Sequence, residues 1–422
     1  MKHRKSFSYD FEQSELNNLK LKMLNWIQPF SIFSFLDNNG YQHQPNRFEM
    51  LVAVGIHQQL PLFPESVGDW VFGHVAYDFK NQVNPALKSK NPDDSGFEDC
   101  RFFIPQTVVY IPFGVNKIVV ESMDPDAERI LNDILNQDTH TPEMRRTAMD
   151  WQFSTTKAAY LEKIKTIQNH IVEGDFYELN YCSKVHAETE NFDPFAVFQE
   201  LNTINPSPFA AFYKNKDSYL ISASPERFLY KSDLMIVSQP IKGTISRLEK
   251  ETDDMLQKEI LHNDEKERAE NVMIVDLMRN DLAQCCEVGT IKVPELFGVY
   301  SFPQLHHLIS TVEGQLLPNQ SLYDIFKVTF PMGSMTGAPK RMVMEMIEHY
   351  ELARRGLYSG TLGYIMPNGD FDFNVVIRSL IYNANNRILS YQTGGAITFD
   401  SHPEKEWAEL KLKAKAIKNM FN

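Results

Sequence analysis

Apolar side chains in the second half of the chain follow two spacings. Between Leu161 and Ile171 they recur every three or four residues, which predicts one face of a helix. Ser154-Thr155-Thr156 offers capping hydroxyls before it, and Gly174 is a typical end. Shorter apolar runs bounded by polar residues predict strands. The same patterns predict helices at 269–284, 339–353 and 403–420, and strands at 219–223, 234–237, 360–364, 371–382 and 387–399.

The first hundred residues alternate short apolar runs with turn clusters such as Asp37-Asn38-Asn39-Gly40, which predicts a strand-rich region. A helix is expected at 124–135, followed by a polar connector at 136–150. We therefore divide the chain into an N-terminal strand-rich region, residues 1–145, and a second region, residues 153–422. Strands and helices alternate irregularly, so the fold class expected is α+β.

Composition narrows the class of protein. The chain has 422 residues, 43% of them hydrophobic, and a formal net charge of −13, which argues against non-specific binding to nucleic acid. No apolar run approaches the roughly 20 residues that cross a bilayer. The start, Met1 to Ser6, is basic but not followed by an apolar signal segment, so a cytoplasmic location is expected. Four cysteines form no disulfide framework, and none belongs to a recognisable glutaminase triad.

Two pairs of carboxylates stand three residues apart, Glu267 with Glu270 and Glu406 with Glu409. On a helix this spacing places both side chains on one face, about one turn apart. Such pairs are common on solvated faces. If the two helices converge, the four acids would instead offer the oxygen ligands that Mg²⁺ prefers.

Other residues suit an anionic ligand. Arg378 interrupts the apolar run 374–381, and a buried guanidinium needs an anionic partner, either a substrate carboxylate or a structural acid. Gly394 and Gly395 follow a strand, where they either let backbone N–H groups approach an anion or mark an ordinary bend. The turn 331–340 fails the phosphate-loop pattern, which argues against a nucleotide hydrolase.

Lys242 lies next to Gly243 after an apolar strand. In apolar surroundings its pKa is expected to fall, which would release a nucleophilic amine; the alternative is a solvated surface lysine.

Several segments taken together resemble the chorismate-utilising enzyme family, over residues 153 to 422. The segments are Gly174–Asn180, Ser222–Phe228, Pro240–Thr244, Glu270–Asp281, Gly333–Lys340 and Gly394–Glu409, with a weaker match at Trp70–Asp78. The resemblance implies a large two-lobed α+β fold with stacked β-sheets flanked by helices.

The resemblance also implies roles for the residues already singled out. Glu270 and Glu409 would bind Mg²⁺, with Glu267 and Glu406 behind them or acting through water. Arg378 and Tyr358 would grip the enolpyruvyl carboxylate of chorismate, helped by backbone groups near Gly394 and Gly395. The remaining substrate contacts implied are Gly243, Thr244, Ser334 and Thr336.

Two further residues match positions that the family uses for catalysis. His307 would lie near the departing hydroxyl, and the alternative is a hydrogen-bonded core histidine. Glu226 would transfer protons, and the alternative is a structural partner for Arg227 or another cation.

Two positions indicate the branch of the family. Glu178 stands where the water-adding members have a lysine, which argues against isochorismate and salicylate formation, although the ammonia-using branch more often has Gln there. Lys242 stands where anthranilate-forming members have a small residue, and it implies a covalent route to 4-amino-4-deoxychorismate. Ammonia would come from a separate glutamine amidotransferase subunit. The alternatives are anthranilate formation and a catalytically silent chorismate-binding subunit.

Overall fold

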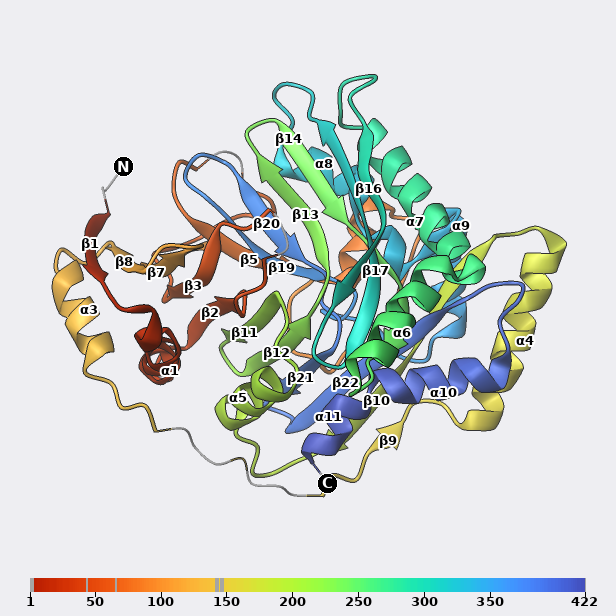
Figure 1. The fold of residues 1–422 in the computed structure, drawn as a ribbon, viewed down its shortest axis with the longest axis horizontal. Coiled ribbons are helices and arrows are strands. Elements are labelled where there is room, and N and C mark those ends of the chain that lie inside the picture. The colour runs from red at the N-terminus through yellow and green to blue at the C-terminus, as the bar shows by residue number, and fades with distance from the viewer. Residues whose placement is uncertain (1–3, 43–44, 65–66, 141–143, 145–147, 422) are drawn as a thin grey trace.

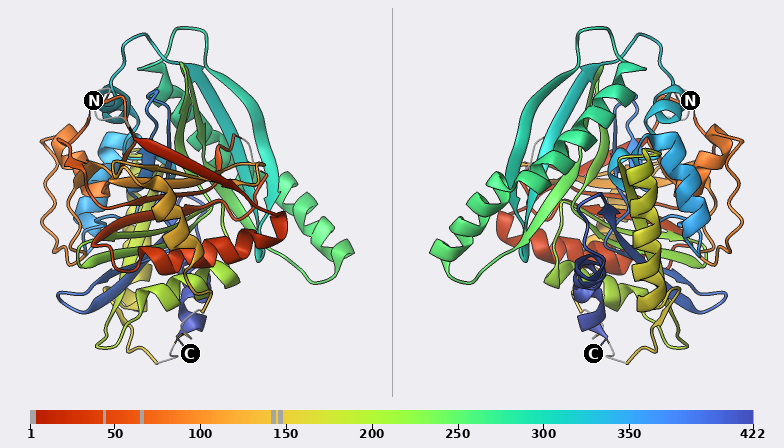
Figure 2. Two further views of the ribbon diagram at one scale, coloured as in Figure 1. Left: turned by 90° about the vertical axis from the view of Figure 1, so that its left-hand side faces the viewer. Right: turned by 90° about the vertical axis from the view of Figure 1, so that its right-hand side faces the viewer.

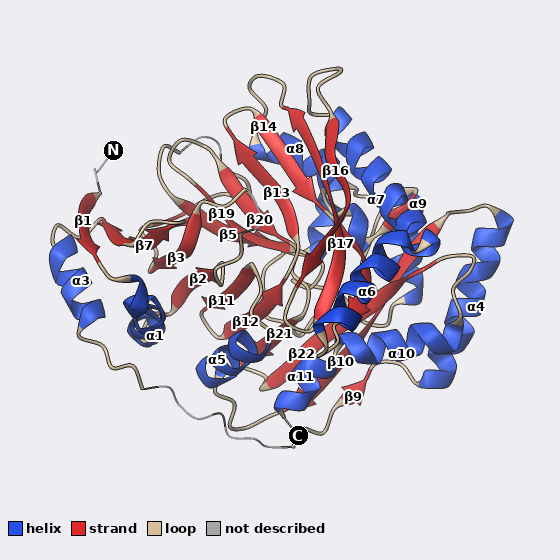
Figure 3. Cartoon of the chain, viewed as in Figure 1, coloured by secondary structure: helices blue, strands red, loops and turns tan. Residues whose placement is uncertain are grey.

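Two large antiparallel sheets lie face to face, with helices on their outer surfaces (Figures 1 and 3). This computed structural model describes residues 4–42, 45–64, 67–140, 144 and 148–421. The architecture confirms the α+β class and the stacked sheets flanked by helices. Part of the connector expected at 136–150, and the first three residues, lie outside the described residues.

The strands fall into a twelve-stranded and a ten-stranded sheet. The first sheet contains, in spatial order, β1 (Lys5–Asp10), β8 (Lys117–Ser122), β7 (Thr107–Pro112), β3 (Phe48–Val54), β2 (Ile32–Asp37), β11 (Phe209–Asn215), β12 (Ser218–Ser224), β21 (Ser379–Asn383), β22 (Ile388–Ile397), β10 (Glu178–Glu188) and β18 (Gly337–Ala338), with β9 (Gln152–Phe153) beside β10. The second contains β15 (Ile241–Ser246), β17 (Leu305–Gln315), β14 (Met235–Gln239), β13 (Arg227–Ser232), β20 (Phe371–Asn374), β19 (Thr361–Ile365), β5 (Val71–Val75), β6 (Cys100–Ile104) and β4 (Gln58–Gln59), with β16 (Lys292–Ser301) beside β17.

Both sheets combine strands from the two regions that the sequence suggested. β2 pairs with β11 along its whole length, and β5 pairs with β19. The hydrogen-bonded sheets run continuously across residues 145–153, so the pairing of the strands does not separate the two regions. The division at these residues remains a prediction from the sequence.

Helices cover the outer faces in groups. Against the first sheet lie α1 (Leu16–Ile27), α3 (Ala127–Leu135), α5 (Pro194–Ile204) and α11 (Lys415–Met420); against the second lie α7 (Glu265–Ala283) and α8 (Leu322–Thr329). α4 (Lys157–Glu173), α9 (Lys340–Tyr350) and α10 (Pro403–Lys413) share a third apolar cluster, and the right-hand view of Figure 2 shows α4 beside α10. α6 (Glu251–Asn263) packs against β15 and β17, and α2 (Lys80–Val83) is a short helix. 3₁₀ turns lie at Gln13–Glu15, Tyr77–Phe79 and Gly333–Met335.

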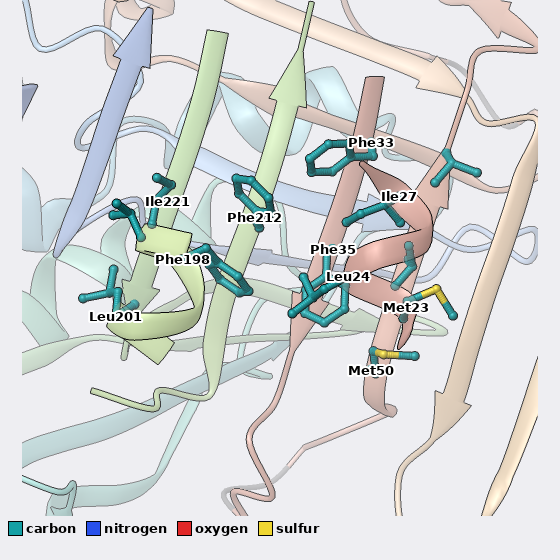
Figure 4. Packing of buried hydrophobic residues seen from close by; sticks show 14 of the residues in the cluster. Met23, Leu24, Ile27, Phe33, Phe35, Met50, Phe198, Leu201, Phe212 and Ile221 are labelled. Carbon is teal, nitrogen blue, oxygen red and sulfur yellow. The ribbon is translucent and has the colours of Figure 1, made fainter. Parts of the chain in front are cut away.

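Large apolar side chains hold these layers together. Phe33 and Phe35 of β2 point toward Ile27 of α1, and Phe212 of β11 packs with Phe198 of α5 (Figure 4). A separate cluster, including Phe72, Phe103 and Tyr213, fills the space between the two sheets. Burial of a side chain of this kind contributes roughly 1.5–3 kcal/mol.

The expected helix over 154–174 is confirmed. Thr156 accepts a hydrogen bond from the backbone N–H of Ala159, and Gly174 ends the helix with φ of 85°. The helix expected at 403–420 is divided at Ala414 into α10 and α11.

The single strand expected at 371–382 is wrong. It consists of β20 and β21, which belong to different sheets, and the chain crosses between them at residues 375–378. Arg378, with φ of 51°, lies in this crossing and not inside a strand. The chain crosses a second time beside it, at Pro225 and Glu226, and the N–H of Val375 donates to the backbone oxygen of Glu226 at 3.0 Å. A periodicity of two cannot show that a continuous apolar run changes sheet.

Gly394 and Gly395 are expected to follow a strand, but they lie within β22. They stand opposite Cys182 and Tyr181 of β10, respectively. Among the described residues, no helix combines the length and the apolar character that a membrane span requires.

Candidate active site

One cavity of about 1410 Å³ gathers almost all of the residues that the sequence singled out. Its walls come from β10, β15, β17, β22, α7 and α10, together with the two crossings between the sheets. The expected residues in its lining are Glu226, Lys242, Gly243, Thr244, Glu267, Glu270, His307, Ser334, Tyr358, Arg378, Gly394, Gly395, Glu406 and Glu409. Segments separated by up to 183 positions in the chain thus form one site.

Thr336 is the expected residue that does not line this cavity. It is fully buried, and its hydroxyl donates to the backbone oxygen of Met332 at 3.1 Å. Its role in this structure is to hold the turn that presents Ser334.

Lys242 faces carboxylates, so the expectation of apolar surroundings and a lowered pKa is wrong. Its Nζ donates to Oε1 of Glu178 at 2.7 Å, and the lysine side chain is only 11% exposed. Burial favours the neutral amine, but Glu178 and Glu270 outweigh it and raise the pKa of Lys242 above its ordinary value. The sequence hid this pairing because the two residues lie on strands of different sheets.

Glu226 is buried at the start of the crossing into β13, where Ser334 Oγ donates to its Oε1 at 2.6 Å. Burial raises the pKa of Glu226 to about 7, more than the hydrogen bond from Ser334 lowers it. A carboxyl group with this pKa exists in both protonation states near neutrality, as proton transfer requires. The alternative role as partner of Arg227 is wrong, because Arg227 pairs with Asp372 at 3.0 Å.

Arg378 projects from its crossing onto His307 of β17. Its Nη2 donates to His307 Nε2 at 2.8 Å, and the other ring nitrogen lies 2.9 Å from Thr244 Oγ1. Burial and the neighbouring guanidinium lower the pKa of His307 well below its ordinary value, so the ring is neutral. With Nε2 accepting from Arg378, the ring proton resides on Nδ1 and is donated to Thr244.

In the described part of the chain, the guanidinium forms no ion pair with a carboxylate, although the charge of Glu226 acts on it. Burial lowers the pKa of Arg378 to about 10, which leaves it cationic at neutral pH. Among the described residues, no acid lies within 4.0 Å of it. The structural ion pair that the sequence left open is therefore not formed by the described chain, and the charge is available to an anionic ligand.

Tyr358 also lines the cavity. Its hydroxyl is 3.7 Å from Cys182 Sγ, and burial raises its pKa well above the ordinary value, so the phenol remains a neutral donor. Lys413, which also lines the cavity, donates to the backbone oxygen of Gly394 at 2.9 Å and to Glu409 at 2.8 Å. Lys413 follows Glu409 by four positions, a helical spacing from which this pair was predictable.

The two acid pairs approach each other from α7 and α10. Burial, followed by the charges of Glu270 and Glu409, raises the pKa of Glu267 to about 7. Glu270 lies 3.7 Å from Lys266, and Glu406 accepts from Ser401 at 2.8 Å. The charges of Glu270 and Glu409 thus act on Glu267 across the cavity, and a region of clustered carboxylates is one where a cation would be stabilised.

This donor set fits Mg²⁺, which takes oxygen ligands and keeps several waters or substrate oxygens. The four acids do not form a closed cage. Within the described residues, the one group of three ligand atoms lying within 4.8 Å of one another is at the surface, at His170, Glu173 and Asp175.

The chain is similar in sequence to several known proteins. The chorismate binding enzyme family matches residues 28–419. Aminodeoxychorismate synthase component 1 of Escherichia coli (strain K12) is 41% identical over 268 residues, which are 64% of this chain and 58% of that protein. An anthranilate synthase component I-like protein of Synechocystis is 32% identical over 396 residues, 92% of this chain and 78% of that protein.

The fold is similar to that of solved structures as well. Anthranilate synthase component I of Streptococcus pneumoniae superposes with a TM-score of 0.75 at 25% identity, covering 99% of this chain and 92% of that one. The match to the Escherichia coli relative spans less than three fifths of that relative's length. With nearly the whole chain matched and the expected residues gathered in one cavity, the chain belongs to the chorismate binding enzyme family.

Proposed function

We propose that the protein converts chorismate and ammonia into 4-amino-4-deoxychorismate, as component I of an aminodeoxychorismate synthase that serves p-aminobenzoate and folate synthesis. The observation that carries the proposal is Lys242, which lines the same cavity as Arg378, Glu226 and the four glutamates. Relatives with the name aminodeoxychorismate synthase component 1 support it.

Chorismate carries two carboxylates, and the cavity has a cation for one of them. The enolpyruvyl carboxylate would lie against Arg378 and the Tyr358 hydroxyl, because both are donors that the described acids do not neutralise. The ring carboxylate would lie on the side of Glu270 and Glu409, the residues that would hold Mg²⁺. Bound there, Mg²⁺ would neutralise the clustered charge and polarise the ring carboxylate.

Lys242 and Glu226 divide the chemistry. The neutral amine of Lys242 forms a bond to ring C2, both ring double bonds move one position toward C4, and the C4–O bond breaks. Protonated Glu226 gives its proton to the departing oxygen, which leaves as water. Ammonia then attacks C4, the double bonds return, the C2–Nζ bond breaks, and Glu226 takes back a proton from the new amine.

Ammonia would come from a separate glutamine amidotransferase subunit, and a cytoplasmic location remains our expectation for both. Free ammonium should then support activity without the partner.

The test is to incubate the protein with chorismate, Mg²⁺ and ammonium at alkaline pH and to identify the product by mass spectrometry. We expect 4-amino-4-deoxychorismate, and we expect Lys242→Ala to bind chorismate but to lose the amination. Anthranilate with pyruvate as the main product would contradict the proposal and support an anthranilate synthase. Chorismate binding without turnover would indicate a silent subunit.

A further inference from the structure

Glu178 is a buried carboxylate that the chemistry so far does not use. It begins β10, its side chain is 1% exposed, and its Oε1 accepts from Lys242 Nζ at 2.7 Å. In the described chain, its second oxygen, Oε2, is buried without a hydrogen-bond partner. A carboxylate with one oxygen on a cation and the other unsatisfied still has capacity to accept a proton.

The strand holds this carboxylate in a fixed position. Glu178 pairs with Ala338 of β18, and a Cβ on Gly337 would collide with the backbone oxygen of Glu178. On the other side, Asn271 of α7 donates to the backbone oxygen of Lys242 at 3.3 Å. Both partners of the ion pair are therefore fixed by their backbones, which preserves the 2.7 Å contact.

Charges from three further positions act on the pair. Glu270 and Lys266 face it from α7, and Glu409 faces it from α10. Burial raises the pKa of Glu178 more than the Lys242 ammonium lowers it. The acids Glu178, Glu270 and Glu409 raise the pKa of Lys242. At neutral pH, a lysine in protonation equilibrium with the solvent is therefore almost entirely an ammonium.

An ammonium has no lone pair and cannot attack carbon, so Lys242 must lose a proton within the site. Burial disfavours both charges of the pair, which brings the neutral amine and carboxylic acid closer in free energy to the ion pair. Transfer of one proton along the hydrogen bond from Lys242 to Glu178 converts the ion pair into the neutral pair, and this transfer does not need solvent.

On the basis of the proposed function, we propose that Glu178 is the catalytic base that turns the Lys242 ammonium into the nucleophilic amine, and the acid that reprotonates it. The proton passes from Nζ to Glu178 before the Nζ–C2 bond forms. After ammonia has attacked C4 and the C2–Nζ bond has broken, the proton returns from Glu178 to the released amine. Glu226 independently protonates the departing C4 oxygen, so the two carboxyl groups serve different atoms.

The experiment mixes the full chain with chorismate and Mg²⁺ in the absence of ammonia. The reaction is run at several pH values between 6.5 and 9.5, and samples are quenched with acid at successive times. The mass of the intact protein then shows the adduct on Lys242, which adds the mass of chorismate minus one water. The variants are Glu178→Gln, which keeps shape and hydrogen bond but cannot hold the proton, and Glu178→Asp, which keeps the acid. Glu348→Gln is the matched control, because it removes the half-buried carboxylate partner of a different buried lysine, at 2.6 Å from Lys80.

We expect adduct formation in Glu178→Gln to fall by roughly 10²-fold at pH 7. It should then rise about tenfold per pH unit, because the amine must now come from equilibrium with solvent. Glu178→Asp should restore part of the rate and the shallow pH dependence of the wild type, and Glu348→Gln should keep both. Chorismate affinity by calorimetry should be similar in all four proteins.

Equal adduct rates in wild type and Glu178→Gln at every pH would overturn the role of Glu178 and leave the covalent route intact. If the wild type forms no adduct and Lys242→Ala still aminates chorismate, the covalent route itself is overturned. The two failures are therefore distinguishable.

Discussion

Glu226 couples the protonation of the active site to the stability of the fold. Its pKa is about 7 in the folded protein and near 4.5 when unfolded. Between these values the folded state binds more protons than the unfolded state, so the free energy of unfolding falls as the pH rises through this window. The contribution is fully present below about pH 4.5 and is lost above about pH 7; its size is up to about 3 kcal/mol.

Glu226→Gln removes this titration while it keeps an acceptor for Ser334. We expect the stability of the ligand-free wild type to fall by about 2–3 kcal/mol more than that of the variant between pH 5 and pH 8. Denaturant unfolding at the two pH values measures the difference. Because Glu267 titrates in the same range in both proteins, it cancels from the comparison; parallel curves would contradict the buried, protonated state of Glu226.

Arg378 combines a strained backbone with a free charge, and two substitutions separate these properties. Its φ of 51° lies in the left-handed region, which costs an L-residue roughly 1–2 kcal/mol and glycine almost nothing. We expect Arg378→Gly to be more stable than Arg378→Ala by about 1 kcal/mol, and both to lose chorismate affinity equally. Thermal unfolding and calorimetry test this, and an equal stability of the two variants would show that the backbone is not strained.

At the scale of elements, β22 packs so closely on β10 that two neighbouring glycines have different functions. A Cβ on Gly394 would collide with the backbone oxygen of Tyr181 and lie 2.6 Å from Cys182 Sγ. A Cβ on Gly395 would meet only the ends of side chains, with Glu406 Oε2 nearest at 3.2 Å.

Gly394→Ala should therefore destabilise the protein by roughly 1–3 kcal/mol. Gly395→Ala should fold normally but raise the KM for chorismate, because its methyl group enters the cavity beside the acids. Melting temperatures and steady-state kinetics separate the two effects. A greater loss of stability in Gly395→Ala than in Gly394→Ala would contradict this assignment.

The sequence indicated the helices more accurately than the contacts of the site. α4 and α7 follow from a periodicity that the local chain contains in full, and so do the acid pairs three residues apart. The pairing of Lys242 with Glu178, of Ser334 with Glu226 and of Arg378 with His307 depends on which sheet each strand joins. These contacts span 64 to 108 positions, and no local pattern encodes them.

At the scale of the whole molecule, both sheets need strands from both ends of the chain. Residues 153–422 alone would leave β11 without β2 and β19 without β5, and would lose part of the cluster between the sheets. Exposed strand edges and a half-formed core favour aggregation over folding.

We expect residues 153–422 to be insoluble or to unfold without a cooperative transition, and to fold when co-expressed with residues 1–145. Circular dichroism with thermal unfolding tests both statements. A cooperative transition of residues 153–422 alone would show that the second region is an independent domain.

The two adjacent crossings between the sheets have a mechanical consequence. Glu226 and Arg378 lie on linkers that are bonded to each other, whereas Lys242 belongs to one sheet and Glu409 to an outer helix. Because Arg378 also donates to His307, and His307 lies 2.9 Å from Thr244 on the strand of Lys242, a movement of one sheet past the other is passed from the linkers to that strand. Substitutions in the core between the sheets, far from any substrate, would therefore move the anion-binding arginine and the nucleophile together, and alter binding and catalysis at once.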